Sequence, residues 1–159
     1  MALTRMQLIM IAAGGSALLL GGAFLFQLAG YPPCKMCLWQ RWPHAAAIAV
    51  GVLAFGLQAR VPAALGALTL LGALAALITA AIGAFHAGVE QGFWEGPTSC
   101  SAGPISDLTP DELLEQILNA PLVRCDEIAW QLAGISMAGW NALLSLALAL
   151  VWLLAFRKA

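Results

Sequence analysis

Long apolar stretches, separated by short polar ones, dominate this chain and predict its architecture. Four of them reach the length of about 20 residues that a helix needs to cross the hydrocarbon core of a bilayer. They cover residues 6–28, 38–57, 62–84 and 135–156. The pattern predicts an all-α integral membrane protein, in which a four-transmembrane-helix bundle forms one domain over residues 1–159.

The first apolar stretch resembles a signal peptide at first sight, but it is longer than the roughly 7–15 apolar residues of a signal-peptide core. We therefore predict that it is a retained transmembrane helix. Its small residues are expected to let neighbouring helices approach closely, because packing replaces the hydrophobic drive between helices in lipid. These residues are Gly14, Gly15, Ser16, Gly21 and Gly22.

Two polar segments, residues 29–37 and 85–134, are predicted to be loops on the same side of the membrane. Pro32 and Pro33 stop the first helix just before Cys34, because a proline has no backbone N–H to donate. The third apolar helix is expected to end near residues 84–86.

The longer loop contains the signature of a short amphipathic helix. Thr109 and Glu112 have the spacing of a capping box, and Pro110 stands at the first helical position. Asn119 and Pro121 are expected to terminate this helix. We expect it to lie on the membrane surface, with docking of a partner as the alternative. Its predicted apolar face consists of Leu113, Leu114, Ile117 and Leu118.

Composition supports the membrane assignment. Of the 159 residues, 62% are hydrophobic and only 9% are charged, against about 25% charged in an ordinary soluble domain. Such a chain has too few polar side chains to cover a globule in water. All eight acidic residues lie between Glu90 and Glu127, and no basic run suggests binding to nucleic acid.

The basic residues indicate an orientation. If all four apolar helices span the membrane, four of the seven basic residues fall on the side of both termini: Arg5, Arg60, Arg157 and Lys158. The other side carries Lys35, Arg41 and Arg124. The positive-inside rule then places both termini in the cytoplasm and the loops of the cysteines outside.

All four cysteines fall in or beside those outer loops. Cys34 and Cys37 form a Cys-x-x-Cys, which closes too small a loop to stabilise a fold and is a common spacing for redox thiols. Cys100 and Cys125 suit a structural disulfide as well as a redox pair. A zinc site made of the four cysteines is disfavoured because the second pair lacks zinc-ligand spacing, and we predict no metal site.

The position of the Cys-x-x-Cys favours redox chemistry. Cys37 lies near the start of the second helix, where the positive helix end favours a thiolate. Arg41, four residues later, shares its helix face and can stabilise an anion. Two dithiol pairs on one side suggest a relay by disulfide exchange, and a two-electron acceptor that resides in the membrane is a quinone.

With these features the chain resembles the bacterial disulfide-bond formation protein B (DsbB) family of quinone-coupled thiol oxidases. The resemblance covers nearly the whole chain, including the Cys-x-x-Cys followed by Arg41, and the stretch from Cys125 to Trp140. It implies a protein-disulfide:quinone oxidoreductase that reoxidises a periplasmic thioredoxin-like (DsbA-like) thiol oxidase and reduces ubiquinone, with menaquinone as the alternative cofactor.

The resemblance also implies roles for single residues. Cys100 is expected to form a mixed disulfide with the soluble partner, and Cys125 to resolve it and exchange with Cys34. Cys37 is expected to face the quinone as a thiolate, supported by Arg41.

Three further residues are expected near the quinone by the same resemblance. They are His86, Met137 and Trp140. A helix-end anchor, an apolar filler and a membrane-interface tryptophan are the alternatives for them. His44 is interpreted as a packing histidine, and four other polar residues as solvated loop residues: Glu90, Gln91, Asp126 and Glu127.

Two other interpretations compete with this one. An enzyme similar to vitamin K epoxide reductase also combines four helices, loop cysteines and a quinone-type ligand, but there the Cys-x-x-Cys usually follows the loop pair. A non-catalytic tetraspan protein with structural disulfides is the alternative outside enzymes.

Overall fold

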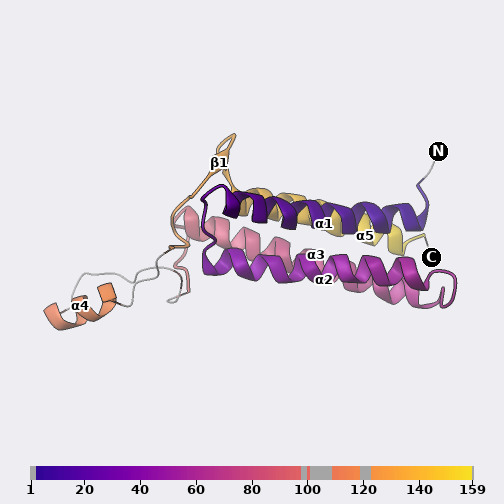
Figure 1. Ribbon diagram of the computed structural model, residues 1–159, viewed down its shortest axis with the longest axis horizontal. Coiled ribbons are helices and arrows are strands. Elements are labelled where there is room, and N and C mark those ends of the chain that lie inside the picture. Colours follow the sequence, from indigo (N-terminus) through magenta and orange to yellow (C-terminus); the bar gives the residue numbers. More distant parts are fainter. Residues whose placement is uncertain (1–2, 98–99, 101–108, 119–122, 159) are drawn as a thin grey trace.

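Four long helices form an antiparallel bundle, seen in the computed structural model of the chain (Figure 1). The structure describes residues 3–97, 100, 109–118 and 123–158, without the side chains of residues 112, 113, 116 and 117. The helices are α1 (Arg5–Leu28), α2 (Lys35–Leu57), α3 (Ala64–Glu90) and α5 (Met137–Phe156). Shorter elements are the helix α4 (Pro110–Leu118) and the strands β1 (Gln131–Leu132) and β2 (Ile135–Ser136).

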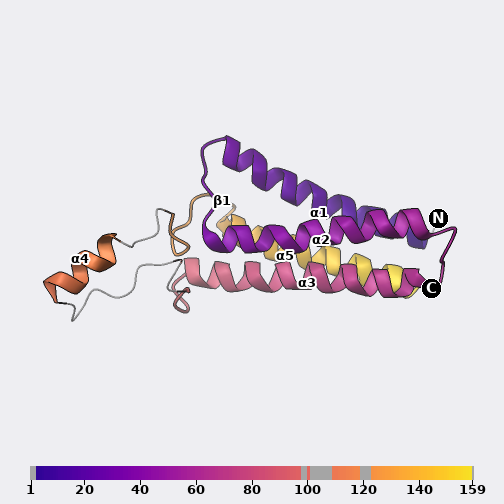
Figure 2. The same cartoon turned by 60° about the horizontal axis from the view of Figure 1, so that its bottom comes forward.

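The bundle is arranged so that α1 and α3 lie diagonally across from each other. Helices α2 and α5 each pack against both α1 and α3, whereas α1 and α3 scarcely touch. Both chain ends lie at one end of the bundle (Figure 1). The other end, where α1 ends, α2 begins, α3 ends and α5 begins, is called the cysteine end below. Towards the cysteine end α1 diverges from α2 (Figure 2).

The predicted helical membrane architecture is confirmed, although α2 is more polar than the other three long helices. Helices α1, α3 and α5 have the length and apolar composition of membrane spans. Helix α2 is equally long, with 23 residues, but its first half contains Lys35, Gln40, Arg41 and His44. This half lies at the cysteine end, where the polar groups of the protein gather.

Helix boundaries follow local capping. Thr4 caps α1 through a capping box with Gln7, and Ser136 caps α5 by accepting a hydrogen bond from the Gly139 N–H. Helix α3 continues to Glu90, beyond its predicted end near residues 84–86. The prediction failed because polar residues were taken as loop, although nothing in residues 84–90 breaks a helix.

The predicted helix of the long loop exists. Helix α4 begins at Pro110 as predicted and projects beyond the cysteine end (Figures 1 and 2). Leu114 and Leu118 of its predicted apolar face are exposed. Leu113 and Ile117 lie outside the described side chains, and Asn119 and Pro121 outside the described residues.

The small residues that permit close packing lie mostly outside α1. A Cβ on Gly14, Gly21 or Gly22 would meet nothing within 4 Å, so the packing prediction holds in α1 only for Gly15, which faces Leu148, and for the buried Ser16. Glycine contacts in the core that are at least as close as that of Gly15 lie on α2 and α3. Gly51 faces Ala13, and Gly72 faces the indole of the fully buried Trp152.

Replacement of Gly72 tests this packing. In Gly72→Ala the new Cβ would lie 2.5 Å from the Trp152 ring. Overpacking of this kind costs about 1–3 kcal/mol, so we expect Tm in detergent to fall by about 3–10 °C. Gly56→Ala on α2 is the matched control, because a Cβ there meets nothing within 4 Å. Equal melting temperatures for the two variants would contradict the packing.

Candidate functional site

The four cysteines come together at the cysteine end. Cys100 and Cys125 are joined by a disulfide and are fully buried. Cys34 and Cys37 are free thiols that pack against this disulfide in one apolar cluster, together with Val89 and other residues. Cys34 and Cys37, called the inner pair below, therefore lie close to Cys100 and Cys125, the loop pair, as the sequence predicted.

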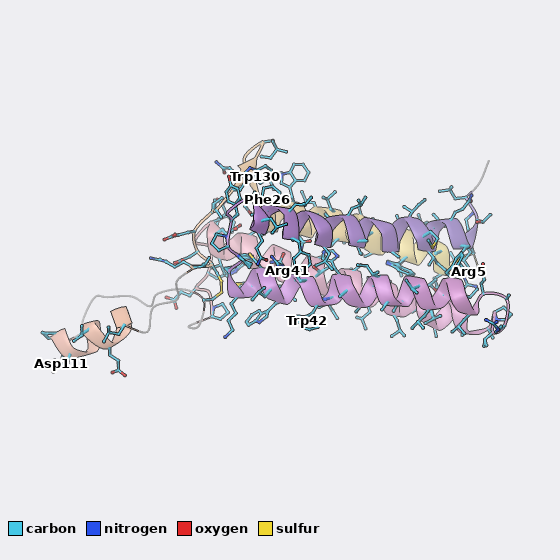
Figure 3. All side chains as sticks on the ribbon, viewed as in Figure 1. Arg5, Phe26, Arg41, Trp42, Asp111 and Trp130 are labelled. Atoms are coloured by element: carbon cyan, nitrogen blue, oxygen red, sulfur yellow. A yellow bond between two sulfur atoms is a disulfide. The ribbon has the colours of Figure 1, made fainter. Side chains whose placement is uncertain are left out.

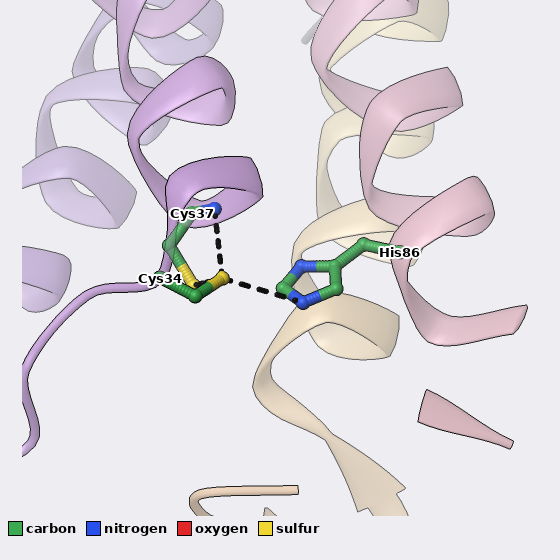
Figure 4. Close-up of side chains that lie close together, drawn as sticks. All are labelled: Cys34, Cys37 and His86. Atoms are coloured by element: carbon green, nitrogen blue, oxygen red, sulfur yellow. Dashed lines mark hydrogen bonds between the residues drawn. The ribbon is translucent and has the colours of Figure 1, made fainter. Parts of the chain in front are cut away.

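The sequence places the inner pair at the first turn of α2. Cys34 is the N-cap residue, and its sulfur accepts a hydrogen bond of 3.2 Å from the Cys37 backbone N–H. The two Sγ atoms are 3.0 Å apart, with the Cys34 thiol donating (Figure 4). Both residues precede the apolar part of α2. This thiol–thiol hydrogen bond, with burial, raises the pKa of Cys34, and it lowers the pKa of Cys37.

His86 reaches the inner pair from α3. Its Nε2 lies 3.5 Å from the Cys34 Sγ and 3.9 Å from a carboxylate oxygen of Glu90, and its Nδ1 lies 3.0 Å from the side-chain nitrogen of Gln40 (Figure 4). The ring also lies within hydrogen-bonding reach of the Cys125 backbone. His86 was predicted near the quinone, and the structure places its ring against the Cys34 thiol.

A buried hydrogen-bond chain continues from His86 into the bundle. The Asn141 Nδ2 of α5 donates to the Gln40 Oε1 of α2 at 2.7 Å and to the Thr79 Oγ1 of α3 at 3.1 Å. The Asn141 Oδ1 bonds the His44 Nε2 at 2.8 Å. His44 is buried, as its packing interpretation requires, while its Nδ1 has no hydrogen-bond partner in the described part of the chain.

Glu90 is not the solvated loop residue that was predicted. It is the last residue of α3, its side chain is only 6% exposed, and it accepts a hydrogen bond from the Ser136 hydroxyl. The prediction was wrong because the extra turns of α3 carry Glu90 against the start of α5. Asp126 is partly exposed and pairs with Arg124, whose hydrogen bond lowers the pKa of this carboxyl.

A cavity of about 250 Å³ lies between α1 and the other helices at the cysteine end. Apolar side chains form most of its wall, and all four long helices contribute residues to it, α3 only the polar His86 and Glu90. All six inner residues predicted for catalysis or cofactor binding line it: Cys34, Cys37, Arg41, His86, Met137 and Trp140. The disulfide of Cys100 and Cys125 lies beside it, behind Cys34.

The side chain of Arg41 extends from α2 to α1. Its guanidinium donates to the Gln27 Oε1 at 2.8 Å and to the Ala23 carbonyl at 3.5 Å, and it lies 4.7 Å above the centre of the Phe24 ring. Its Nε is buried and has no hydrogen-bond partner among the described residues. The cavity is therefore bordered by a cation with one unused donor (Figure 3).

A two-stranded hairpin before α5 positions the last cavity residues. Ala133 and Gly134 form its turn with φ values of 53° and 78°, the pair of positive angles that a tight two-residue hairpin requires. The Trp140 indole donates to the Leu132 carbonyl at 3.1 Å, and the ring of Trp130 lies 5.0 Å from that of Phe26 (Figure 3). The hairpin thus joins the start of α5 to the end of α1.

Fold and site together define a helical membrane protein with a redox-type dithiol beside a loop disulfide. A family model described as "Disulfide bond formation protein DsbB" matches residues 5–155 of the chain. The chain belongs to this family of membrane oxidoreductases.

Individual relatives agree with this assignment. The chain is similar to a "Disulfide bond formation protein B" of Polaromonas sp. (strain JS666 / ATCC BAA-500), with 31% identity over 96% of this chain and 90% of the relative. It is also similar to a "Disulfide bond formation protein B 2" of Pseudomonas syringae pv. syringae (strain B728a), with 32% identity over 91% of this chain and 83% of the relative. No solved structure gives a significant match.

Sequence reasoning missed several residues of the site. Gln40, Asn141, Thr79 and Ser136 were not singled out, although they hold His86, His44 and Glu90 in place. A signal was available, because polar side chains inside apolar spans are costly and are usually kept for a function. Gln40 and Asn141 meet that criterion.

Asn141→Leu tests the buried chain. The substitution removes the bonds to Gln40, Thr79 and His44. At roughly 0.6 kcal/mol for each hydrogen bond between membrane helices, we expect a loss of about 2 kcal/mol in the free energy of unfolding. The measurement is an unfolding titration in mixed detergent micelles. Ser145→Ala, which removes a single bond to Asn141, is expected to cost less than about 1 kcal/mol. A similar loss in both variants would contradict a central role for Asn141.

Proposed function

We propose that this chain is a protein-disulfide:quinone oxidoreductase. It takes two electrons from a periplasmic thioredoxin-like, DsbA-like thiol oxidase and passes them to ubiquinone, which sustains disulfide formation in other proteins. The observation that carries the proposal is the shared cavity. The free thiol of Cys37, the cation of Arg41 and a largely apolar wall border one space inside a membrane protein, next to a second cysteine pair.

The cavity residues fit a quinone head group. A volume of about 250 Å³ and walls that include Phe26, Trp130 and Trp140 suit one substituted ring. The unused Nε donor of Arg41 suits a carbonyl oxygen. Ubiquinone, when bound, supplies an acceptor for two electrons and two protons. Arg41 would hold it, while Met137 and Trp140 would pack on the ring.

The electron path begins at the loop pair. A thiolate of the soluble partner attacks Cys100 and releases Cys125, and the second partner thiol completes the exchange, so that the partner leaves with a disulfide. When the inner pair is oxidised, the Cys125 thiolate then attacks Cys34 of the Cys34–Cys37 disulfide and releases Cys37. Cys100 next attacks Cys125 in the mixed Cys125–Cys34 disulfide and frees Cys34. Two electrons have then moved to the inner pair, and the loop disulfide is restored.

One cysteine pairing on this path matches the structure. Cys100 and Cys125 are bonded while Cys34 and Cys37 are free, which is the pairing of the stage in which the inner pair holds the electrons. The His86 Nε2 lies 3.5 Å from the Cys34 Sγ, so its ring is well placed to stabilise negative charge on this sulfur.

We further propose four membrane spans, both termini in the cytoplasm, and the redox cysteines on the periplasmic face of the bacterial inner membrane. Both chain ends lie opposite the cysteine end, which suits this arrangement (Figure 1). The basic residues Arg60, Arg157 and Lys158 also lie at that opposite end, as the positive-inside rule requires.

The test is an assay of ubiquinone reduction by a reduced periplasmic thiol oxidase with the purified chain. Cys37→Ser is expected to lower turnover at least about a thousandfold, because it removes the thiolate that faces the acceptor. Arg41→Ala is expected to raise KM for ubiquinone about tenfold through loss of a charge-assisted hydrogen bond. Arg60→Ala is the control, since Arg60 follows α2 at the opposite end, and it is expected to change neither parameter.

The proposal fails if wild type shows no turnover with either ubiquinone or menaquinone, or if Cys37→Ser turns over normally. The second result would favour a protein whose disulfides are structural. Faster turnover with menaquinone would keep the reaction and change only the acceptor.

A further inference from the structure

The donor atoms around Cys34 have the composition of a transition-metal site. The Sγ atoms of Cys34 and Cys37 and the Nε2 of His86 all lie within 4.8 Å of one another. The prediction of no metal site concerned the four cysteines, whereas this set leaves out the loop pair and adds a histidine from α3. We propose that Cys34, Cys37 and His86 bind a zinc ion when the inner pair is reduced, and that the ion blocks both thiols.

The distances fit a tetrahedral zinc ion after one small movement. Bonds of about 2.3 Å to sulfur and about 2.0 Å to nitrogen, at tetrahedral angles, place sulfur and nitrogen ligands about 3.5 Å apart and two sulfurs about 3.8 Å apart. The Cys34 Sγ and the His86 Nε2 are 3.5 Å apart in the structure. The two sulfurs are 3.0 Å apart, so a rotation of the half-buried Cys37 side chain by under about 1 Å completes the set.

The surroundings favour metal-bound thiolates. The Cys37 backbone N–H donates to the Cys34 sulfur at 3.2 Å, and the start of α2 contributes its positive end. Two thiolates neutralise the ion, and Glu90, with a carboxylate oxygen 3.9 Å from the His86 Nε2, balances the charge of Arg41. All three ligands border the cavity, which leaves the fourth position of the ion open to it.

The second nitrogen of the ligand histidine also has a partner. A metal-bound imidazole usually donates its other N–H to an oxygen, which fixes the ring. The Nδ1 of His86 lies 3.0 Å from the side-chain amide of Gln40. When that amide turns, its oxygen accepts a hydrogen bond from the Nδ1–H, at the cost of the 3.2 Å bond that its nitrogen donates to the Met36 carbonyl.

Zinc would therefore bind only one redox state of the protein. A disulfide between Cys34 and Cys37 removes both thiolates, so oxidation of the pair releases the ion. Under the proposed function, on which this consequence rests, zinc would hold the enzyme in its reduced form and stop delivery of electrons.

Binding is tested with cobalt as a spectroscopic substitute for zinc. The full chain with Cys100→Ala and Cys125→Ala is reduced, freed of reductant without oxygen and titrated with Co²⁺. We expect one equivalent to produce thiolate-to-cobalt charge transfer and tetrahedral d–d bands, and zinc to displace it. The oxidised form is expected to give neither signal.

The two histidines of the chain provide a matched pair. His86→Gln is expected to weaken cobalt binding about a hundredfold, and His44→Gln, at a histidine that lines the same cavity without touching the thiols, less than threefold. Equal affinities in both variants, or equal cobalt signals from the reduced and oxidised chain, would overturn the site.

A measurement on the wild-type chain tests zinc binding without any substitution that could disturb folding. Zinc is expected to slow alkylation of Cys34 and Cys37 at least tenfold, as followed by mass spectrometry, and an unchanged rate would overturn the proposal. These readouts need no quinone, so they do not depend on the oxidase activity.

The inhibition by zinc is tested separately. Micromolar zinc is expected to stop quinone reduction, and a chelator is expected to restore it. Full turnover at saturating zinc would contradict the proposed inhibition but not the zinc site itself.

Discussion

The polar side chains buried in this bundle depend on partners within the protein, because neither lipid tails nor apolar helices can supply one. Asn141 meets that constraint for three helices at once, since its amide bonds Gln40 of α2, Thr79 of α3 and, through its oxygen, His44. Gln40 in turn holds His86 against Cys34. The geometry of the reactive thiols thus depends on hydrogen bonds made one and two helical turns deeper in the bundle.

The same constraint explains how the site is divided. Cys34 and Cys37 line one cavity, in which His86 and Glu90 lie within 4 Å of each other. The rest of the wall is largely apolar, and its cation, Arg41, is held by α1. One pair of cysteines thus lies beside both polar side chains and an apolar space. Under the proposed function, disulfide exchange would use the first and a lipid-soluble acceptor the second.

Much of the fold and of the candidate site could be predicted from the sequence. The predictions that failed did so for physical reasons. The long apolar stretches predict the helices, and the spacing of Cys34, Cys37 and Arg41 predicts that the thiols lie in the first turn of α2. Both predictions depend only on local geometry. The role of Glu90 was missed because helix α3 extends past a polar boundary that looks like a loop. The partners of Asn141 and the glycine that faces Trp152 depend on which helix faces meet. Local periodicity does not contain that information.

The divergence of α1 at the cysteine end has a consequence for supply (Figure 2). The cavity is bordered by Leu18, Leu19 and Leu20 on that helix. Under the proposed function its ligand would arrive by diffusion in two dimensions, and occupancy would follow the mole fraction of that ligand in the bilayer. Changes in lipid composition would alter occupancy even when every protein contact stays the same.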